Sequence, residues 1–314
     1  MMRSSGADSS VQVGVILLTL DQKEKTLRCL ASFEHVREPT FRVVLLDNAS
    51  GDGTLEAVNS AFPDVITHYS PENLGVASGR NTAAEIAIRE LSPEYLFFLD
   101  NDMEVSPAVL SELTSVFRES DGIGQSTGKI MMLGDRERIY GAGGCYVDFT
   151  KGRTGHVGYG ELDRGQYDQP HSCLPSGGCM LVKTDLFRDL HGFDAEFDPY
   201  GPEDLDFGLR ARSAGYEGIY APRAVIFHES TPGHTFEGGM SSSAYVSNKT
   251  RLWFRLMRRH ASLRDWVVFG AWGAPTGVIR MITREAKRGN LLAMRGLLGG
   301  VVGSKKTDKT DPSS

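Results

Sequence analysis

Residues Tyr95 to Glu104 read YLFFLDNDME, an apolar run that ends abruptly in two carboxylates, Asp100 and Asp102, one residue apart. The run has the composition of a strand buried in a sheet, and ligands bind where the carboxyl ends of such strands open into a crevice. Because side chains alternate along extended backbone, the two carboxylates point the same way and can share a divalent cation. A bare D-x-D is more often a solvated strand end, so its meaning depends on the rest of the chain.

Strand-type and helix-type runs alternate through the first half of the chain, which predicts an α/β fold with a mostly parallel central sheet flanked by helices. The clearest strands are residues 13–19, 42–47 and 95–100, and helical spacing of apolar residues marks 23–33 and 74–91. Right-handed crossovers then bring the carboxyl ends of the three strands to one edge of the sheet.

Polar residues follow each of the predicted strands. Thr19 ends the first strand, and Asp47 begins the turn-rich run DNASGDGT after the second. An acid at that position is well placed to accept hydrogen bonds from a ribose or a base edge, while an Asx-turn that caps the next helix explains it equally well. Asp21 and Asn73 stand where they would serve as helix N-caps.

The second predicted helix begins with small residues, in the runs Asn73-Leu74-Gly75 and Gly79-Arg80-Asn81. Small residues let a flat ligand or another backbone approach closely, and Arg80 offers a planar fork to phosphate or carbonyl oxygens. Taken alone, these runs also fit an ordinary helix face.

The second half of the chain has a different character. Residues 122–169 are rich in glycine and predict short strands and mobile loops on the acceptor side. After them PEDLDFGLRARSAG predicts a helix that starts at Pro202, carries acids in its first turn and closes at Gly215. On helix physics alone, Glu203 and Asp204 would merely complement the helix dipole.

Composition places the chain among ordinary globular proteins, with 314 residues, 40% hydrophobic and 24% charged. The four cysteines show no C-x-x-C pair or zinc-ligand spacing, which favours a reducing compartment over a Cys173–Cys179 disulfide. The first residues, MMRSSGADSS, lack a signal-peptide apolar region, and the apolar run 11–20 is too short to span a bilayer. We therefore expect a cytoplasmic protein.

The C-terminal part is basic. Residues 244–300 carry eleven Lys or Arg against two acids, so the rest of the chain is acidic. Its aromatic and aliphatic residues, interleaved with arginines, could pack on the catalytic domain or a second subunit, contact an anionic membrane peripherally, or bind the acceptor. No motif supports nucleic-acid binding. A homodimer is a further hypothesis.

The motifs in their order resemble the inverting glycosyltransferases of family 2, which have the nucleotide-diphospho-sugar transferase (GT-A) fold, and in the middle region the rhamnosyl- and galactofuranosyltransferases among them. The resemblance covers about residues 11–228 and is carried, in chain order, by VGVILLT, LLDNASGDGT, ENLGVASGRN, FFLDND, GAGG, PSGGCMLVKTDLF, HGFDAEFDPYGPEDLDFGLRARSAGY and APRAVIFH. It implies a GT-A catalytic domain, which we place at 11–240. The remaining sequence predicts a disordered N-terminus at 1–10, a basic helical segment at 241–300 and a disordered polar tail at 301–314.

The resemblance also implies a donor site and a metal site. The residues that would hold the nucleotide are Thr19, Asp47, Asn73, Gly75, Arg80 and Asp100, with Asp47 on the base and Asp100 against the ribose and metal-bound waters. Asp102 and His228 would bind Mg²⁺ or Mn²⁺, which suits oxygen ligands and a diphosphate. A lone histidine is otherwise more often structural.

Inverting transfer needs a base that removes the acceptor's proton as it attacks the anomeric carbon. Asp204 matches the family's base, and Glu203, Gly177 and Gly178 match positions near the sugar or acceptor. For the two glycines a tight turn is an equally good explanation.

The function that we expect is metal-dependent, inverting transfer of a sugar from a nucleoside-diphosphate sugar, UDP- or dTDP-linked, to a hydroxyl of a glycan, glycolipid or natural product. One alternative is a phosphohydrolase of the haloacid dehalogenase kind, in which an Asp of the D-x-D is the nucleophile. The other is a sugar-nucleotide-binding protein without turnover.

Overall fold

The structure is a computed structural model of the chain, and it describes residues 11–229, 243–277 and 279. The described chain divides into two units. The first comprises residues 11–146 and 154–229, and the second comprises 147–153 and 243–279. The predicted boundary at residue 240, the segments 1–10 and 301–314, and the TPGHTFEGG run all lie outside the described residues.

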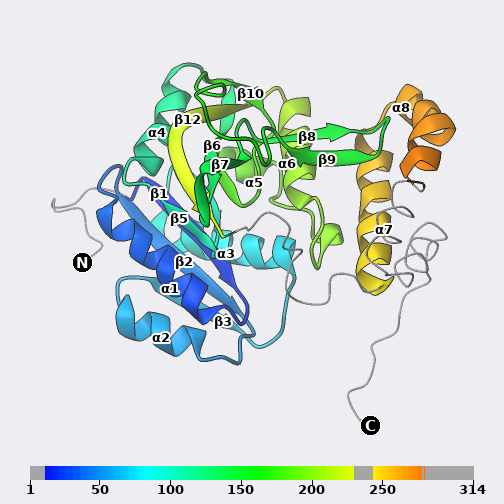
Figure 1. Cartoon of the computed structure of the whole chain (residues 1–314). Coiled ribbons are helices and arrows are strands. Elements are labelled where there is room, and N and C mark those ends of the chain that lie inside the picture. Colours follow the sequence, from blue (N-terminus) through cyan, green and yellow to red (C-terminus); the bar gives the residue numbers. More distant parts are fainter. Residues whose placement is uncertain (1–10, 230–242, 278, 280–314) are drawn as a thin grey trace, which may run out of the picture. The chain divides into compact units, whose positions relative to one another are not determined.

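Four parallel strands form one half of the large sheet in the first unit (Figure 1). They are β1 (Val13–Thr19), β2 (Phe41–Asn48), β3 (Ile66–Ser70) and β4 (Tyr95–Asp100), in the order β3-β2-β1-β4. The register places Thr19 opposite Asp47, and Leu18 opposite Asp100. The three strands predicted from the sequence are therefore confirmed, and their carboxyl ends do meet at one edge.

The other half of the sheet is mixed. β11 (Cys179–Lys183) runs antiparallel between β4 and β6 (Ile123–Met132), and β6 pairs in parallel with β12 (Glu217–His228). The edge strands are β5 (Met103–Val105), β7 (Asp135–Gly141) and β10 (His171–Cys173), and β8 (Cys145–Asp148) pairs with β9 (Arg153–His156) in a separate two-stranded sheet.

β6 corrects the prediction of only short strands and loops in residues 122–169, because all ten of its residues are buried. Its sequence, IGQSTGKIMM, does not have the pattern of a buried strand, because several of the side chains that it buries in the protein are polar. Those side chains are paired: Ser126 Oγ donates to Leu113 O at 2.9 Å, and Thr127 Oγ1 donates to Cys179 O at 2.7 Å. Buried polar groups that are satisfied in this way do not prevent a central strand.

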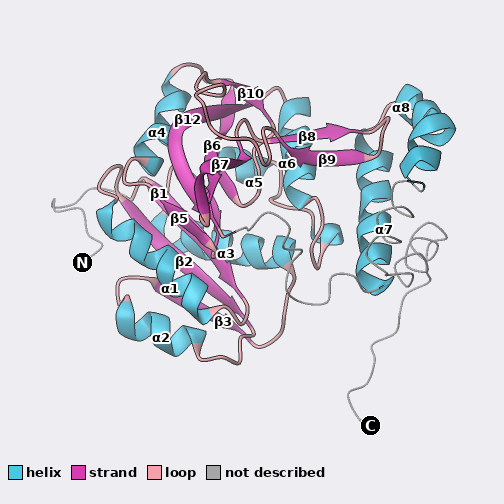
Figure 2. Ribbon diagram, in the orientation of Figure 1, coloured by secondary structure: helices cyan, strands magenta, loops and turns pink. Residues whose placement is uncertain are grey.

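Helices cover both faces of the sheet (Figure 2). One face carries α1 (Lys23–Ser32), α2 (Thr54–Ala61) and α4 (Val109–Ser115), and the other carries α3 (Val76–Leu91), α5 (Thr184–Asp189) and α6 (Glu203–Ser213). Single 3₁₀ turns, η1 (Phe33–His35), η2 (Val116–Arg118) and η3 (Ala195–Phe197), extend the connections.

The strands divide their apolar side chains between two cores, as the period of two requires. In β4, Tyr95, Phe97 and Leu99 enter the core under α1, α2 and α4, while Leu96 and Phe98 enter the core under α3, α5 and α6. Each such fully buried side chain contributes about 1.5–3 kcal/mol to folding. This double burial explains why YLFFLD is apolar without alternation.

The N-caps of the first helices differ from the prediction. Asp21 Oδ1 instead accepts from Gly51 N at 2.7 Å, and the first turn of α1 is bound by Asp52, whose Oδ2 accepts from Lys23 N at 2.9 Å. At α3, Asn73 lies outside the helix, and Asp198 Oδ1 accepts from Ala77 N at 2.8 Å. Both caps come from residues distant in sequence, which local pattern cannot reveal.

The described C-terminal part of the second unit is helical. It contains α7 (Ser243–His260), α8 (Leu263–Val268) and the π-helical stretch η4 (Phe269–Gly273). Ser262 and Asp265 form a reciprocal capping box at the start of α8. No helix in the described ranges is long and apolar enough to cross a membrane.

Candidate active site

Two carboxylates and an imidazole converge at the carboxyl edge of the sheet. Asp100 ends β4, Asp102 lies in the following turn, and His228 ends β12. One potential ligand atom of each lies within 4.8 Å of those of the other two. Antiparallel pairing of β5 with β12 sets His228 opposite Met103, so the sheet itself joins residues that are far apart in sequence.

These three side chains fit a divalent cation. Asp102 Oδ1 and His228 Nδ1 are buried and make no hydrogen bond to any residue that the structure describes. Burial, with the charge of Asp100 adding to it, raises the pKa of Asp102 to about 7. Burial also lowers the pKa of His228, which favours a neutral imidazole. Asp102 Oδ1 lies 3.4 Å from His228 Nε2. The carboxylate of Asp102, the neutral imidazole that faces it and the second carboxylate of Asp100 form a donor set suited to Mg²⁺ or Mn²⁺.

Arg80 links the metal side of the site to α6. It is buried in α3, where Nη2 donates to Asp100 Oδ1 at 2.6 Å and Nη1 donates to Glu203 Oε1 at 2.8 Å. Burial alone would lower the pKa of Arg80, but the charges of Asp100, Glu203 and Asp204 outweigh it and raise that pKa. Burial raises the pKa of Glu203, while the charge of Arg80 opposes that rise. Arg80 is therefore held charged between two acids.

Asp204 lies beside this ion pair, at the start of α6. Its Oδ2 accepts from Gly177 N at 2.8 Å, and its Oδ1 accepts from Leu205 N at 2.7 Å. Two backbone donors fix the plane of the carboxylate. The side chain is half-buried, so it keeps access to the edge of the site.

Gly177 and Gly178 allow the site's side chains to approach the chain closely. A Cβ on Gly177 would lie 2.7 Å from Asp204 Cβ and 2.8 Å from Arg80 Nη1, and one on Gly178 would lie 2.6 Å from Asp100 Oδ2. Neither glycine has a positive φ, so no turn conformation demands them. Absence of a side chain at these two positions lets the three charged residues come together.

The residues predicted to hold the nucleotide lie at the ends of β1 and β2 and before α3. Thr19 Oγ1 is buried in a hydrogen-bonded group with Thr26 Oγ1, at 2.8 Å, and Asn101 Nδ2, at 3.1 Å. Asp47 Oδ1 accepts from Ser50 N, three residues on, at 2.7 Å, and Asp47 does not cap α2, whose N-cap position is Gly53. Contact of either residue with nucleotide stays a prediction.

Asn73 and Gly75 shape the connection into α3. Asn73 Oδ1 accepts from Asn48 Nδ2 at 3.0 Å and from Gly75 N at 2.9 Å. Gly75 has φ +88°, and a Cβ there would lie 2.4 Å from Asp198 Oδ1. Asp198, which sequence reasoning missed, thus packs against the glycine at the start of the helix. Contact of Asn73 or Gly75 with nucleotide stays a prediction.

An aromatic group around Tyr140 lies next to the metal-binding residues. The Tyr140 ring packs against the ring of His228, with centroids 4.3 Å apart, and against His156 at 4.8 Å and Tyr159 at 5.5 Å. Burial, and then the charge of Asp100, raises the pKa of Tyr140. Sequence reasoning passed over Tyr140, because a tyrosine in a short strand carries no motif.

His156 and Cys145 extend this group toward Asp204. Cys145 Sγ and His156 Nδ1 are 3.5 Å apart. Burial lowers the pKa of His156, while the charge of Asp204 acts to raise it. Burial and then the charge of Asp204 raise the pKa of Cys145, which is therefore a protonated thiol. All four cysteines are free, as expected.

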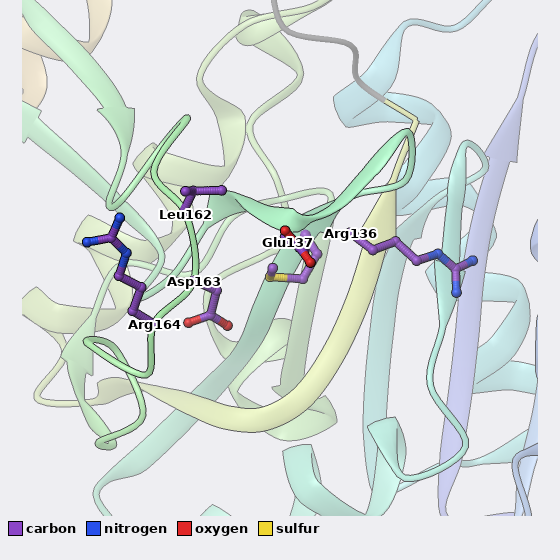
Figure 3. Close-up of a pocket in the computed structure, with 6 residues that line it drawn as sticks. Arg136, Glu137, Leu162, Asp163 and Arg164 are labelled. Carbon is purple, nitrogen blue, oxygen red and sulfur yellow. The ribbon is translucent and has the colours of Figure 1, made fainter.

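A cavity of about 450 Å³ opens elsewhere on the first unit, between β7 and the chain after β9. Figure 3 shows the guanidinium groups of Arg136 and Arg164 directed to opposite sides, with the carboxylates of Glu137 and Asp163 between them. None of the predicted site residues lines it. Its interior acids do not suit a diphosphate, so we do not assign the donor to this cavity.

Two curated proteins are similar to the chain over more than two thirds of its length. It is 24% identical to an N-acetylglucosaminyl-diphospho-decaprenol L-rhamnosyltransferase of Mycobacterium tuberculosis, over 90% of this chain and 97% of that protein. It is 27% identical to the O-antigen biosynthesis protein RfbC of Myxococcus xanthus, over 68% of this chain but only 17% of that protein.

Solved structures share the fold. The structure of GalNAc-T7 with UDP, GalNAc and Mn²⁺ matches 80% of this chain and 48% of that chain, with a TM-score of 0.63 and 17% identity. Residues 1–349 of Staphylococcus aureus TarS match 85% of this chain and 74% of that one, with a TM-score of 0.55 and 17% identity. These matches confirm the predicted GT-A-like fold.

The sequence profile of glycosyl transferase family 2 matches residues 15–190, more than half of the chain. That span contains the strand ends with Thr19 and Asp47, the arginine of α3 and both acids of the D-x-D. The protein is accordingly a glycosyltransferase and belongs to family 2, the family that its strand-end motifs predicted.

Proposed function

We propose that this glycosyltransferase moves a sugar, with inversion and with the help of Mg²⁺ or Mn²⁺, from a UDP- or dTDP-linked donor to a hydroxyl of a lipid-linked glycan. The observation that carries the proposal is the convergence of Asp100, Asp102 and His228, whose ligand atoms lie within 4.8 Å of one another, next to a fixed Asp204. A bound cation would neutralise the charge that develops on the departing nucleoside diphosphate. All other steps depend on the chain's own side chains.

Asp102 and His228 would hold the cation, because Asp102 Oδ1 is buried, makes no hydrogen bond in the described structure and lies 3.4 Å from His228 Nε2. Asp100 differs from them, since its Oδ1 already accepts from Arg80. Its other oxygen is left to meet the ribose or a cation-bound water. Arg80 thereby orients Asp100 and prevents it from turning away from the donor.

Asp204 is the proposed base. Backbone N–H groups of Gly177 and Leu205 hold its carboxylate, and each of its oxygens keeps a second lone pair that can accept the acceptor's proton. Glu203 is a poor alternative, because it is buried and paired with Arg80. Proton removal by a carboxylate fixed in this way is what attack on the anomeric carbon requires.

The name of the mycobacterial relative, which aligns with this chain over 97% of its own length, states a polyprenyl-diphosphate acceptor. We carry that class of acceptor over to this protein as part of the proposal, and with it a cytoplasmic site of action at a membrane surface. The basic C-terminal segment would provide the membrane contact. A homodimer stays a hypothesis.

Family membership disfavours the phosphohydrolase alternative. In that mechanism Asp100, the first Asp of the D-x-D, would attack phosphorus and form a covalent aspartyl phosphate. A binding protein without turnover would predict no sugar transfer, and the test of Asp204 described in the Discussion separates it from the enzyme.

Thermal-shift measurements with UDP, dTDP and GDP, each with and without Mn²⁺, test the donor class. We expect one nucleotide to raise the melting temperature only when Mn²⁺ is present, since ligand that binds the folded state stabilises it. Asp102→Asn should abolish the part of this increase in melting temperature that depends on Mn²⁺. Asp185→Asn, a change of an exposed acid in α5, is the matched control and should preserve it. No response to any nucleotide would refute the proposal.

A further inference from the structure

The helical segment of the second unit exposes large apolar side chains on one side. Leu263 is 81% exposed, Val267 62% and Trp272 67%. The first two are four residues apart, which is one turn of an α-helix. The next step is five residues and crosses η4, whose π-helical turn brings residue i+5 above residue i. The three side chains therefore share one side of the segment.

The other side of this segment is packed within its own unit. The Phe269 ring lies so close to Gly152 that a Cβ there would be 2.7 Å away, and a Cβ on Gly273 would lie 2.2 Å from Thr150 O. Phe254 of α7 packs against Phe269, with ring centroids 5.9 Å apart. One apolar side is thus buried, and a second one faces outward, where a surface helix normally carries polar residues.

The unit that carries these apolar side chains is also positively charged. Arg258 and Arg259 are exposed at the end of α7, and Arg264 is exposed next to Leu263. Residues 244–277 contain six Lys or Arg and a single acid, Asp265. An exposed tryptophan and aliphatic side chains bordered by arginines are the composition of a helix that lies in the interface of an anionic bilayer.

We propose that the face formed by Leu263, Val267 and Trp272 docks on the surface of an anionic lipid bilayer, together with the exposed Arg258 and Arg264 of the same unit. Its three apolar side chains enter the boundary between head groups and acyl chains, while the two guanidinium groups bind lipid phosphates. Because none of the described helices can span a membrane, this docking is peripheral.

A bilayer fits this face better than a second copy of the chain. In a symmetric dimer the same surface meets itself, so both copies would bring a net positive charge to the interface. The like net charges oppose association. An anionic surface instead complements the face, and the inference rests on the proposed lipid-linked acceptor for its biological purpose.

Sedimentation with vesicles tests the proposal without any sugar transfer. We expect the full chain to sediment with vesicles that contain phosphatidylglycerol, to bind phosphatidylcholine vesicles far more weakly, and to be released by high salt. The paired changes L263S/W272S and R258Q/R264Q should each weaken binding about tenfold or more. Controls in the first unit are Tyr69→Ser, an exposed aromatic, and Arg188→Gln, an exposed cation, and both should bind like the wild type.

Quenching of tryptophan fluorescence locates the contact, and a conservative variant distinguishes loss of the contact from misfolding. Brominated lipids should quench tryptophan emission of the wild type, and Trp272→Phe, which keeps an apolar ring, should lose most of that quenching while still sedimenting. No sedimentation with anionic vesicles, or equal binding by the paired variants, overturns the proposal. Self-association that L263S/W272S abolishes would also overturn it, in favour of an interface between copies. Since nucleotide-dependent thermal stabilisation is measured separately, failure here leaves the proposed sugar transfer intact.

Discussion

Arg80 Nη2 lies 2.6 Å from Asp100 Oδ1, and this ion pair joins the middle of α3 to the end of the central strand. The same guanidinium reaches Glu203 through Nη1, so one arginine balances two acids in a site that also holds Asp102 and Asp204. Without it, four carboxylates would repel one another at the sheet edge. The ion pair therefore explains how such an acidic site can exist before a cation binds.

Arg80→Met should destabilise the folded protein by about 3–5 kcal/mol, because it leaves the buried Glu203 without its partner. Urea unfolding measures this free energy. Arg89→Met on the same helix is the control, since Arg89 is exposed and pairs with Glu90 at the surface, where a pair contributes about 1 kcal/mol or less. The double change R80M/E203Q should recover part of the loss, and equal stability of R80M and R89M would contradict the buried pair.

Affinity for Mn²⁺ should fall as the pH drops below about 7. The pKa of Asp102 is raised to about 7, so the carboxyl is protonated below that pH and ionised above it. A proton and the cation compete for the same oxygens, which predicts about tenfold weaker binding for each pH unit below the pKa. Titration by Mn²⁺ electron paramagnetic resonance between pH 5.5 and 8 is the measurement. Affinity that stays constant across this range would show that Asp102 does not bind the ion.

Asp204→Asn should lower turnover by about two to four orders of magnitude, because an amide cannot take up the acceptor's proton. Nucleotide and Mn²⁺ affinity should stay within a few-fold of the wild type, as measured by calorimetry. The exposed Asp185→Asn serves again as control and should turn over normally. Normal turnover by Asp204→Asn would remove Asp204 as the base.

Tyr140 should act through His228 rather than on the sugar. Removal of its ring in Tyr140→Ala frees the imidazole that packs against it at 4.3 Å, and loss of such support typically weakens metal binding 10- to 100-fold. Tyr140→Phe keeps the ring and should bind Mn²⁺ like the wild type in the absence of donor. Tyr159→Ala is the matched control, since Tyr159 packs on Tyr140. Unchanged affinity in Tyr140→Ala would refute the positioning role.

Asp198→Ala should cost about 1–2 kcal/mol of stability, the range measured for loss of a helix N-cap. The carboxylate accepts from Ala77 N at 2.8 Å and from Ser78 N at 3.2 Å, and both donors would lose their partner. Asp185→Ala, in the first turn of α5 and exposed, is the control for removal of a surface acid. If the two variants unfold at the same urea concentration, α3 does not depend on this cap.

The sequence by itself determined those strands and helices that are specified by the spacing of apolar residues over a few positions. β1 and β4 begin and end where their apolar runs do, and α3 ends where its helical spacing ends. The motif order predicted the family, and the acids at the ends of β2 and β4 marked the edge where the site forms. Short-range periodicity and side-chain type carry this information, because burial of a whole strand imposes it along the chain.

The partners of those residues were decided by the tertiary structure. Pairing of β12 with β5 brings His228 to Asp102, packing of α6 beside α3 brings Glu203 to Arg80, and the loop before α6 caps α3 through Asp198. β6 stayed hidden because its buried polar side chains find partners elsewhere in the fold. Hydrogen bonds and ion pairs between distant segments leave no periodic trace in sequence, so only the folded chain shows which residues share the site.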